Sequence, residues 1–343
     1  MRTIYIGIQS ISSEHIRSLF QEYCRDNDVE LDFHGYDYQT LNDDPLLYHD
    51  LKMRSKDADF ILVSCMADPD RFNRFQEYIA SLNCSKTTVF IFVGNAEIRE
   101  TYRHLFNRSD EEYRALVECL NHKGTENELK ILGWMIDVYS GNYAGPPKAT
   151  IPDDTGIYHG GRLYLEDADE YLDELEPDKP RVGIVIDSGS WIYKDLSSAD
   201  CLIESLEGAG MSTIPILFSN MVSKGHDLYR SSKDVLCRYF VRDGKPLVDT
   251  VLVCSGFSLL VNSKTGGTGP STPDSENYLL NDLNVPLIHI MTVRRHVEYS
   301  EDVKGMEKSE LFTQVVWPEV DGQIISVPFS MRDGERTGMT API

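Results

Sequence analysis

Apolar and polar positions follow two kinds of pattern over the first 150 residues. Three runs, Thr3–Ile8, Asp59–Ser64 and Thr88–Val93, are mostly apolar, rich in β-branched residues and without alternation. Strands that are buried on both faces of a parallel sheet have this composition. After the first run, apolar residues recur at helical spacing, at Ile16, Leu19, Phe20, Tyr23 and Cys24. The order strand, helix, strand predicts an α/β unit.

The succession of strand and helix patterns stops near Gly141 and starts again in the second half of the chain. Helical patterns end before Gly141 and the pair Pro146–Pro147, where we place a domain boundary. The segment Glu166–Asp178 contains eight acids and no bases, which favours a solvated helix or connector. Strands are expected after it at Val182–Ile186, Ile214–Phe218, Thr250–Val253 and Pro286–Met291. The predicted fold is therefore α/β, with two Rossmann-like parallel-sheet units, residues 1–150 and 151–343, joined by an acidic connector.

Composition narrows the classes of function. The chain has 55 acidic and 33 basic residues, and its formal net charge of -22 opposes binding to nucleic acid or to anionic lipid. Its seven cysteines form no CxxC pair, which is typical of a reducing compartment and favours the cytoplasm. No apolar run approaches the roughly 20 residues of a membrane span. We expect a soluble protein that is not exported.

Ligands of open parallel sheets usually bind beside the carboxyl ends of the strands, so the loops after the predicted strands are candidate sites. Asp187–Trp191 offers free backbone N–H groups and the flat apolar face of Trp191; a packed turn around a core tryptophan is the alternative. The loop Thr265–Gly269, with Gly266 and Gly267, could hold an anion through its backbone amides, or be a plain loop. It has no Walker lysine, so we expect no ATP site here.

Two further segments carry titratable or charged side chains. Gly156–Gly161 flanks Tyr158 and His159 with glycines, and imidazole could ligate a metal transiently or shuttle protons. A turn that needs positive φ explains the same glycines without any function. His289 sits at the end of a hydrophobic strand, and Arg294 and Arg295, which follow it, could bind substrate carboxylates. Ion pairing with the nearby Glu298, Glu301 and Asp302 is the alternative.

The segment Pro318–Gly322 places Glu319 and Asp321 two residues apart. It follows an expected helix whose apolar face is Leu311, Phe312, Val315 and Val316. A partly buried carboxylate can pass a hydrated cation or accept a proton. A solvent-facing β-turn is the alternative.

The order of these segments resembles one family. Pro180–Ile186 with Asp200–Ile203, Asp249–Ser258, Leu283–Leu287 and Pro318–Gly322, preceded by Gly156–Gly160, is similar to the CobN-type subunit of cobaltochelatase and the H subunit of magnesium chelatase. The resemblance is clearest from Asp154 to Val327 and covers only the amino-terminal part of the family. It departs from the family at Asp187–Gly189, where members more often have an aromatic and a basic residue.

The resemblance implies a tetrapyrrole-binding part of an ATP-dependent cobalt or magnesium chelatase. The divalent metal would be the substrate, and ATP would be used only by AAA+ and integrin-like partner subunits. Glu319, Asp321 and His159 are then the expected catalytic residues, with His159 and Glu319 on the metal. The expected substrate-binding residues are Tyr158, Trp191, Gly266, Gly267, Arg294 and Arg295.

Members that insert metal are several times longer than this chain. The resemblance therefore implies a truncated form, the product of a split gene or a short paralogue, and we expect the isolated chain to be inactive. The alternative function is a non-catalytic α/β binding or scaffold module for another small anionic ligand or a protein partner.

Overall fold

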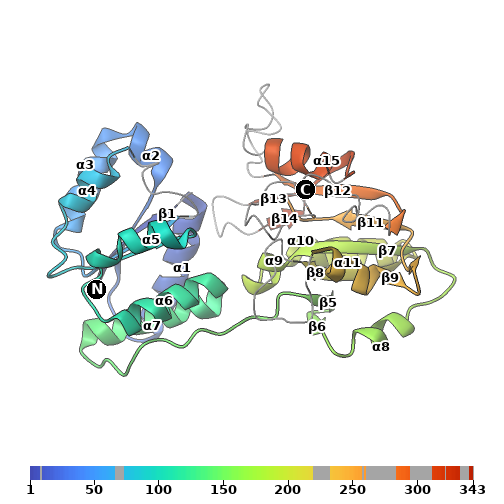
Figure 1. The fold of residues 1–343 in the computed structure, drawn as a ribbon, viewed down its shortest axis with the longest axis horizontal. Coiled ribbons are helices and arrows are strands. Elements are labelled where there is room, and N and C mark those ends of the chain that lie inside the picture. The colour runs from blue at the N-terminus through green and yellow to red at the C-terminus, as the bar shows by residue number, and fades with distance from the viewer. Residues whose placement is uncertain are drawn as a thin grey trace. The chain divides into compact units, whose positions relative to one another are not determined.

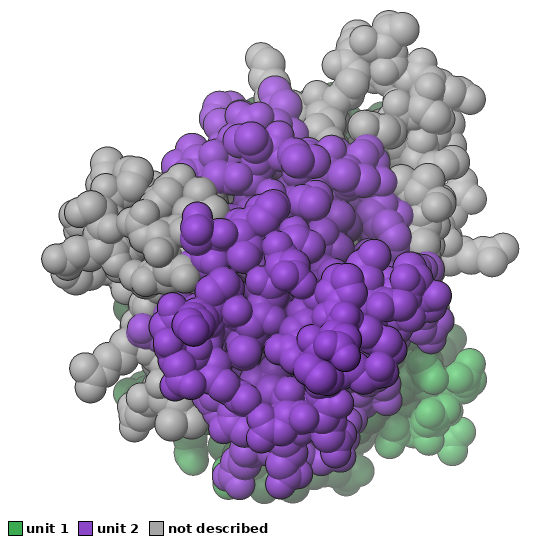
Figure 2. Space-filling model, turned by 90° about the vertical axis from the view of Figure 1, so that its right-hand side faces the viewer, with its two compact units in different colours: residues 1–151 green, residues 152–343 purple. Residues whose placement is uncertain are grey.

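A computed structural model of the chain describes residues 1–7, 10–65, 73–218, 232–256, 259, 283–293, 311–320, 322–332 and 340–342. The chain divides into two compact units, Met1–Ile151 and Pro152–Ile343, which Figure 2 colours separately. Each unit contains a sheet with parallel strands and helices packed against it (Figure 1). The predicted α/β class with parallel-sheet units is confirmed.

The first unit has a four-stranded parallel sheet in the order β2-β1-β3-β4. Its strands are β1 (Arg2–Gly7), β2 (Asp32–Asp37), β3 (Phe60–Cys65) and β4 (Thr88–Val93). Three of them match the apolar runs of the sequence. The edge strand β2 was not predicted, because its sequence DFHGYD alternates polar and aromatic residues around a glycine instead of forming an apolar run.

Helices of the first unit contribute to two separate cores. The helices are α1 (Ser10–Asp26), α2 (Tyr38–Asp43), α3 (Pro45–Ser55), α4 (Phe75–Ala80), α5 (Ala96–Thr101), η2 (Arg103–Leu105), α6 (Asp110–His122) and α7 (Thr125–Ser140). One core joins strand residues such as Ile4 and Ile61 to α3 and α4. The other joins Phe60 and Phe90 to α1, α6 and α7. Alternate strand residues thus serve the two faces of the sheet.

A buried carboxylate fixes the start of α6. Ser109 caps the helix, and the side chains of Ser109 and Glu112 form a capping box. Glu112 is 4% exposed and also accepts hydrogen bonds from Arg108 Nε at 2.6 Å and from Trp134 Nε1 at 3.2 Å. One side chain therefore joins the start of α6 to the core tryptophan of α7.

The second unit contains an eight-stranded mixed sheet in the order β14-β13-β12-β11-β7-β8-β5-β6. In Figure 1 the part of this order from β12 to β6 runs from top to bottom of the unit. Its strands are β5 (Gly156–His159), β6 (Arg162–Tyr164), β7 (Arg181–Asp187), β8 (Ser212–Phe218), β11 (Thr250–Val253), β12 (Leu287–Val293), β13 (Ile325–Arg332) and β14 (Thr340–Pro342). The strands from β13 to β8 are parallel, whereas β14, β5 and β6 pair antiparallel. A separate hairpin pairs β9 (Val241–Arg242) with β10 (Lys245–Pro246).

Helices pack on both faces of this sheet. They are α8 (Ala168–Asp173), α9 (Ser188–Ile192), α10 (Ser197–Gly208), α11 (Ser232–Phe240), the π-helix η3 (Phe312–Val316) and α15 (Trp317–Val320). Ile184 and Ile186 of β7 pack with Leu202 of α10. Val185, on the opposite face of β7, packs in the core that includes α8 and Tyr239 of α11.

The acid-rich segment lies within the second unit, so the prediction that it connects the two units is wrong. It forms α8, whose Tyr171 is buried and donates from its hydroxyl to the carbonyl oxygen of Thr213 at 2.9 Å. Arg238 and Arg242, about 70 residues further on, pair with the acids of α8. Pattern alone missed this because the arginines that neutralise the helix lie far away in the sequence.

Candidate functional site

The two-glycine turn between β5 and β6 presents His159. Gly160 and Gly161 have φ of 57° and 78°, and His159 is paired with Arg162 across the hairpin. Positive φ at both central residues defines a tight hairpin turn that glycine adopts at no steric cost. Because β5 runs antiparallel to β8, the hairpin lies at the amino ends of the parallel strands.

His159 is held by a carboxylate. Its Nε2 lies 2.9 Å from Oε1 of Glu207 on α10, and the same oxygen accepts a hydrogen bond from Thr213 Oγ1 at 2.6 Å. The imidazole also packs beside Tyr171, with 5.6 Å between ring centroids. About a third of the side chain remains exposed to solvent.

Tyr158, the neighbour of His159, points into the core beneath α10. It is 2% exposed, and its hydroxyl donates to Oδ1 of Asp200 at 2.7 Å. Burial, together with this carboxylate, raises the pKa of Tyr158 to about 12. Its ring lies 5.8 Å from that of Trp191.

Trp191 belongs to the segment that follows the carboxyl end of β7, whereas His159 lies at the amino ends of the parallel strands. The segment after β7 is the short helix α9, and Oδ1 of Asp187 accepts a hydrogen bond from the Gly189 backbone N–H at 2.8 Å. Trp191 is half-buried against the core beneath α10. Among the predicted site residues that the structure describes, Trp191 is the one that follows the carboxyl end of a strand.

Glu319 projects from α15 at the amino end of β13. Its side chain is exposed, and its carbonyl oxygen accepts a hydrogen bond from Gly322 N at 3.0 Å. The N–H of Gln323 donates to the carbonyl of Pro318 at 3.1 Å, which closes the turn just before the strand. The predicted segment therefore forms a compact turn with its first acid facing solvent.

The structure does not bring His159 and Glu319 together. His159 is on β5, and Glu319 precedes β13; the strands β12, β11, β7 and β8 lie between them. Since neighbouring strands are about 4.8 Å apart, the two side chains are too distant to ligate the same ion. Within the described ranges, no group of three or more His, Cys, Asp or Glu side chains could hold a metal ion.

Five of the predicted site residues lie outside the described residues. They are Gly266, Gly267, Arg294, Arg295 and Asp321.

A buried polar cluster behind Glu319 was not predicted. His289 is fully buried within β12, whereas the sequence suggested the end of a strand. Its Nε2 lies 3.1 Å from Oε1 of Gln314 in the π-helix η3. The side chain of Gln323, also fully buried, lies beside the same ring. Burial lowers the pKa of His289, so the ring is neutral at neutral pH.

The π-helix explains why the sequence missed Gln314. The apolar face expected from α-helical spacing is not buried: Leu311 is 43% exposed and Phe312 is 53% exposed. Hydrogen bonds from i to i+5 change the angle between successive side chains, so Gln314 faces the sheet instead. Gly256, after β11, leaves room for it, since a Cβ at that position would lie 2.7 Å from Gln314 Nε2.

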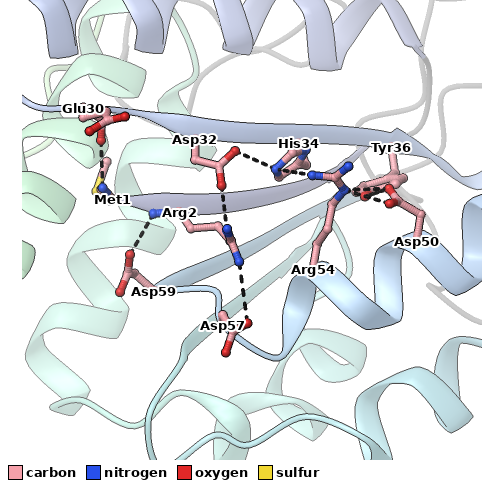
Figure 3. Close-up of polar contacts among 10 residues, drawn as sticks. All are labelled: Met1, Arg2, Glu30, Asp32, His34, Tyr36, Asp50, Arg54, Asp57 and Asp59. Carbon is pink, nitrogen blue, oxygen red and sulfur yellow. Dashed lines mark hydrogen bonds and ion pairs between the residues drawn. The ribbon is translucent and has the colours of Figure 1, made fainter.

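The first unit has its own polar network along the edge strand β2 (Figure 3). Contacts join, in order, Arg2, Asp32, His34, Arg54, Asp50 and Tyr36. His34 Nε2 lies 2.7 Å from Asp32 Oδ1 and 3.0 Å from Arg54 Nη1. One ring nitrogen can donate to the carboxylate or accept from the guanidinium, but not both at once. Charged side chains on an edge strand also disfavour pairing with another chain.

An open α/β sheet hosts many unrelated functions, so the fold alone defines an architecture and not one reaction. A family model described as CobN/Magnesium Chelatase matches residues 117–343, well over half of the chain. The chain belongs to this family, and the resemblance stated from the sequence is confirmed.

Related sequences and one solved structure agree with this. The chain is 28% identical over 203 residues to the chloroplastic magnesium-chelatase subunit ChlH of Oryza sativa. The aligned region covers 54% of this chain and 13% of that protein. It is 24% identical over 236 residues to an uncharacterized protein of Methanocaldococcus jannaschii, covering 66% of this chain and 18% of that protein. The fold is similar to that of the catalytic subunit of cobaltochelatase from Mycobacterium tuberculosis, with a TM-score of 0.59 at 14% identity, covering all of this chain and 26% of that one.

The chain thus spans less than a fifth of the length of these two curated relatives. Among the helices of the described residues, none combines the length and the apolar character needed to cross a membrane.

Proposed function

We propose that this chain is the tetrapyrrole-binding, amino-terminal part of the large subunit of an ATP-dependent cobalt or magnesium chelatase. The observation that carries the proposal is the family match over residues 117–343, which includes the whole second unit. The cobaltochelatase-like fold supports it. The metal is the substrate, and ATP is hydrolysed by AAA+ and integrin-like partner subunits.

Glu319 is the proposed proton acceptor. Insertion of a divalent cation into a metal-free tetrapyrrole releases two N–H protons, so a base beside the macrocycle accelerates the step. An exposed carboxylate can take each proton and pass it to water. Its oxygen atoms also suit a hydrated magnesium ion or a cobalt ion before transfer.

Trp191 and His159 have separate proposed roles because they lie at opposite ends of the strands. Trp191 supplies a flat apolar face on which a macrocycle can stack. His159, paired with Glu207, is a proposed proton relay rather than a ligand that shares the ion with Glu319.

Macrocycle binding tests the proposal directly. The chain is titrated with a metal-free porphyrin and a metal-free corrin-type macrocycle, followed by the absorbance of the macrocycle and by tryptophan fluorescence. We expect saturable binding of one of them and quenching that falls when Trp191 is changed to Phe. The buried Trp134 of the first unit provides the matched control, since Trp134→Phe should leave the quenching in place.

The complete chelatase is titrated in parallel. If neither macrocycle binds the chain or the complete enzyme, the proposal is wrong, and a scaffold role becomes the better explanation. Equal quenching in the Trp191→Phe variant and in the wild-type chain would remove Trp191 from the site.

A further inference from the structure

Glu319 lies in a segment whose two ends carry glutamine side chains that contact the sheet. Gln314 lies before it in η3, and Gln323 lies after it at the end of the turn. Both side chains lie beside His289 of β12. The two glutamines are nine residues apart in the sequence, and both lie beside this imidazole.

The polar atoms of this cluster are buried and incompletely paired. His289 and Gln323 are both fully buried. By hydrogen-bond geometry, His289 Nδ1 and both side-chain amide atoms of Gln323 are unpaired, although the Gln323 amide and the backbone carbonyl of Val253 both lie close enough to the ring to raise its pKa. Unpaired polar atoms in a protein interior are costly, so a ring nitrogen and an amide left open side by side favour each other as partners, directly or through one water molecule.

A neutral imidazole suits this arrangement. It has one N–H donor and one lone pair, while an amide offers both a donor and an acceptor. Whichever nitrogen carries the proton, Gln314 and Gln323 can together satisfy the ring. A charged imidazole would need an acceptor at both nitrogens, and burial disfavours that charge.

We propose that His289 is a positioning residue that bridges Gln314 and Gln323. The bridge fixes the turn before β13, and the turn fixes the position of the Glu319 side chain. This inference rests on the proposed function only for its catalytic consequence. The anchoring of the turn can be measured without any metal or macrocycle.

Hydrogen exchange followed by mass spectrometry measures the anchoring. The N–H groups of Gly322 and Gln323 close the turn, so the peptide that contains them reports its opening. In His289→Leu, which removes both ring nitrogens, exchange of this peptide should be about 10-fold faster than in the wild-type chain. His289→Gln, which restores an amide, should recover most of the protection. Ile203→Ala, a buried change in α10 on the other face of the sheet, controls for general loss of stability.

The catalytic consequence is measured in the complete chelatase. His289→Leu should lower kcat about 10-fold with KM for the macrocycle unchanged, because a base displaced by about 1 Å loses reaction geometry while the binding surface remains. His289→Gln should restore kcat. If His289→Leu folds poorly, Gln323→Leu removes the other half of the bridge and should give the same two changes.

Unchanged exchange at the turn in both His289→Leu and Gln323→Leu would overturn the inference. So would a fall in kcat no larger than that of Ile203→Ala. A Glu319→Gln variant assayed alongside separates the two proposals: normal metal insertion by that variant would refute the role of Glu319, whereas the exchange measurement still decides whether His289 anchors the turn.

Discussion

Tyr158 of β5 and Asp200 of α10 are joined by a hydrogen bond of 2.7 Å that crosses from the antiparallel edge of the second sheet to the helix above it. The tyrosine is almost completely buried, whereas the carboxylate is partly exposed. This contact shows that Tyr158 links β5 to α10, whereas the substrate contact implied by the family resemblance stays a prediction.

Tyr158→Phe should therefore destabilise the second unit by about 1 kcal/mol, below the usual value for a hydrogen bond to a charged group because water can replace the hydroxyl at Asp200. Urea unfolding measures the change. Tyr164→Phe on β6 is the matched control and should stay within about 0.5 kcal/mol of the wild-type chain. Equal effects of the two substitutions would show that the hydrogen bond contributes nothing.

The same contact predicts a dependence on alkaline pH. The pKa of Tyr158 is raised in the folded state to about 12 from an ordinary value of about 10. A raised pKa means that the neutral form is favoured by folding, so this stabilisation is complete below about pH 10 and is lost as the pH rises towards 12. Tyr158→Phe should remove that part of the alkaline decline in stability, and tyrosinate absorbance should show one late-titrating residue fewer.

Glu319→Gln should leave folding and macrocycle binding unchanged while lowering metal insertion by about 10²-fold, the usual effect of removing a general base. The side chain is exposed, so the amide creates neither a cavity nor a buried unpaired group. Insertion by the complete chelatase is measured over a range of metal concentrations. Glu204→Gln, an exposed acid of α10, is the control. A large loss of thermal stability in Glu319→Gln would mark the residue as structural.

His159 and Glu319 should act independently. They are separated by four strands, and substitutions more than about 10 Å apart without shared partners add within about 0.5 kcal/mol. We expect the effect of His159→Gln combined with Glu319→Gln on log(kcat/KM) to equal the sum of the single effects. A coupling energy well above 1 kcal/mol would mean that the two side chains ligate one ion in the working enzyme.

Glu112 should be the most sensitive polar residue of the first unit. Glu112→Leu leaves Arg108, Ser109 and Trp134 without their buried acceptor, and breaking such a cluster costs about 3 kcal/mol. Ser109→Ala, which removes only the cap, should cost about 1 kcal/mol. Trp134 fluorescence follows the unfolding of this unit. Nearly equal losses in the two variants would show that the capping box, not the buried acceptor, determines the stability.

Acid should weaken the polar network that links β1, β2 and α3. The hydrogen bond from Arg54 lowers the pKa of Asp50, and that from Arg2 lowers the pKa of Asp32. Lowered values mean that the charged forms are favoured by folding, so this stabilisation is present above about pH 4 and is lost as the pH falls further. Both carboxylates are more than a third exposed, so Asp50→Asn should cost only about 0.5 kcal/mol at pH 7 and nothing near pH 2.

Continuous apolar runs predicted β1, β3 and β4 of the first sheet and β7, β8, β11 and β12 of the second. The strands containing Ile61, Val89, Ile184 and Val251 are buried on both faces, and such strands carry their signal in the local sequence. The strand β2 lacks that signal because it alternates polar and aromatic residues and is only partly buried, whereas the other edge strand, β4, is buried and keeps an apolar run. The short strands β5 and β6 were expected only as a glycine turn, since four residues are too few to show a period.

The geometry of the candidate site could not be predicted in the same way. Whether His159 and Glu319 meet depends on strand order, and strand order is decided by long-range pairing that no local pattern contains. The contact of Gln314 with His289 depends on a π-helical turn, and α-helical spacing of the apolar residues does not reveal such a turn. Gln323 gave no signal at all, because a single amide after a turn is common at surfaces.

The π-helix also determines how the segment Phe312–Val316 would respond to the deletion of one residue. Each i to i+5 bond encloses one residue more than the corresponding α-helical bond, so Phe312–Val316 holds a residue that an α-helix of the same span would not need. Deletion of one residue would let the segment rewind as an α-helix between the same two ends and would turn Gln314 away from the sheet. The length of this segment in other chains of the family therefore reports, by a count of residues alone, whether they keep the inward-facing amide.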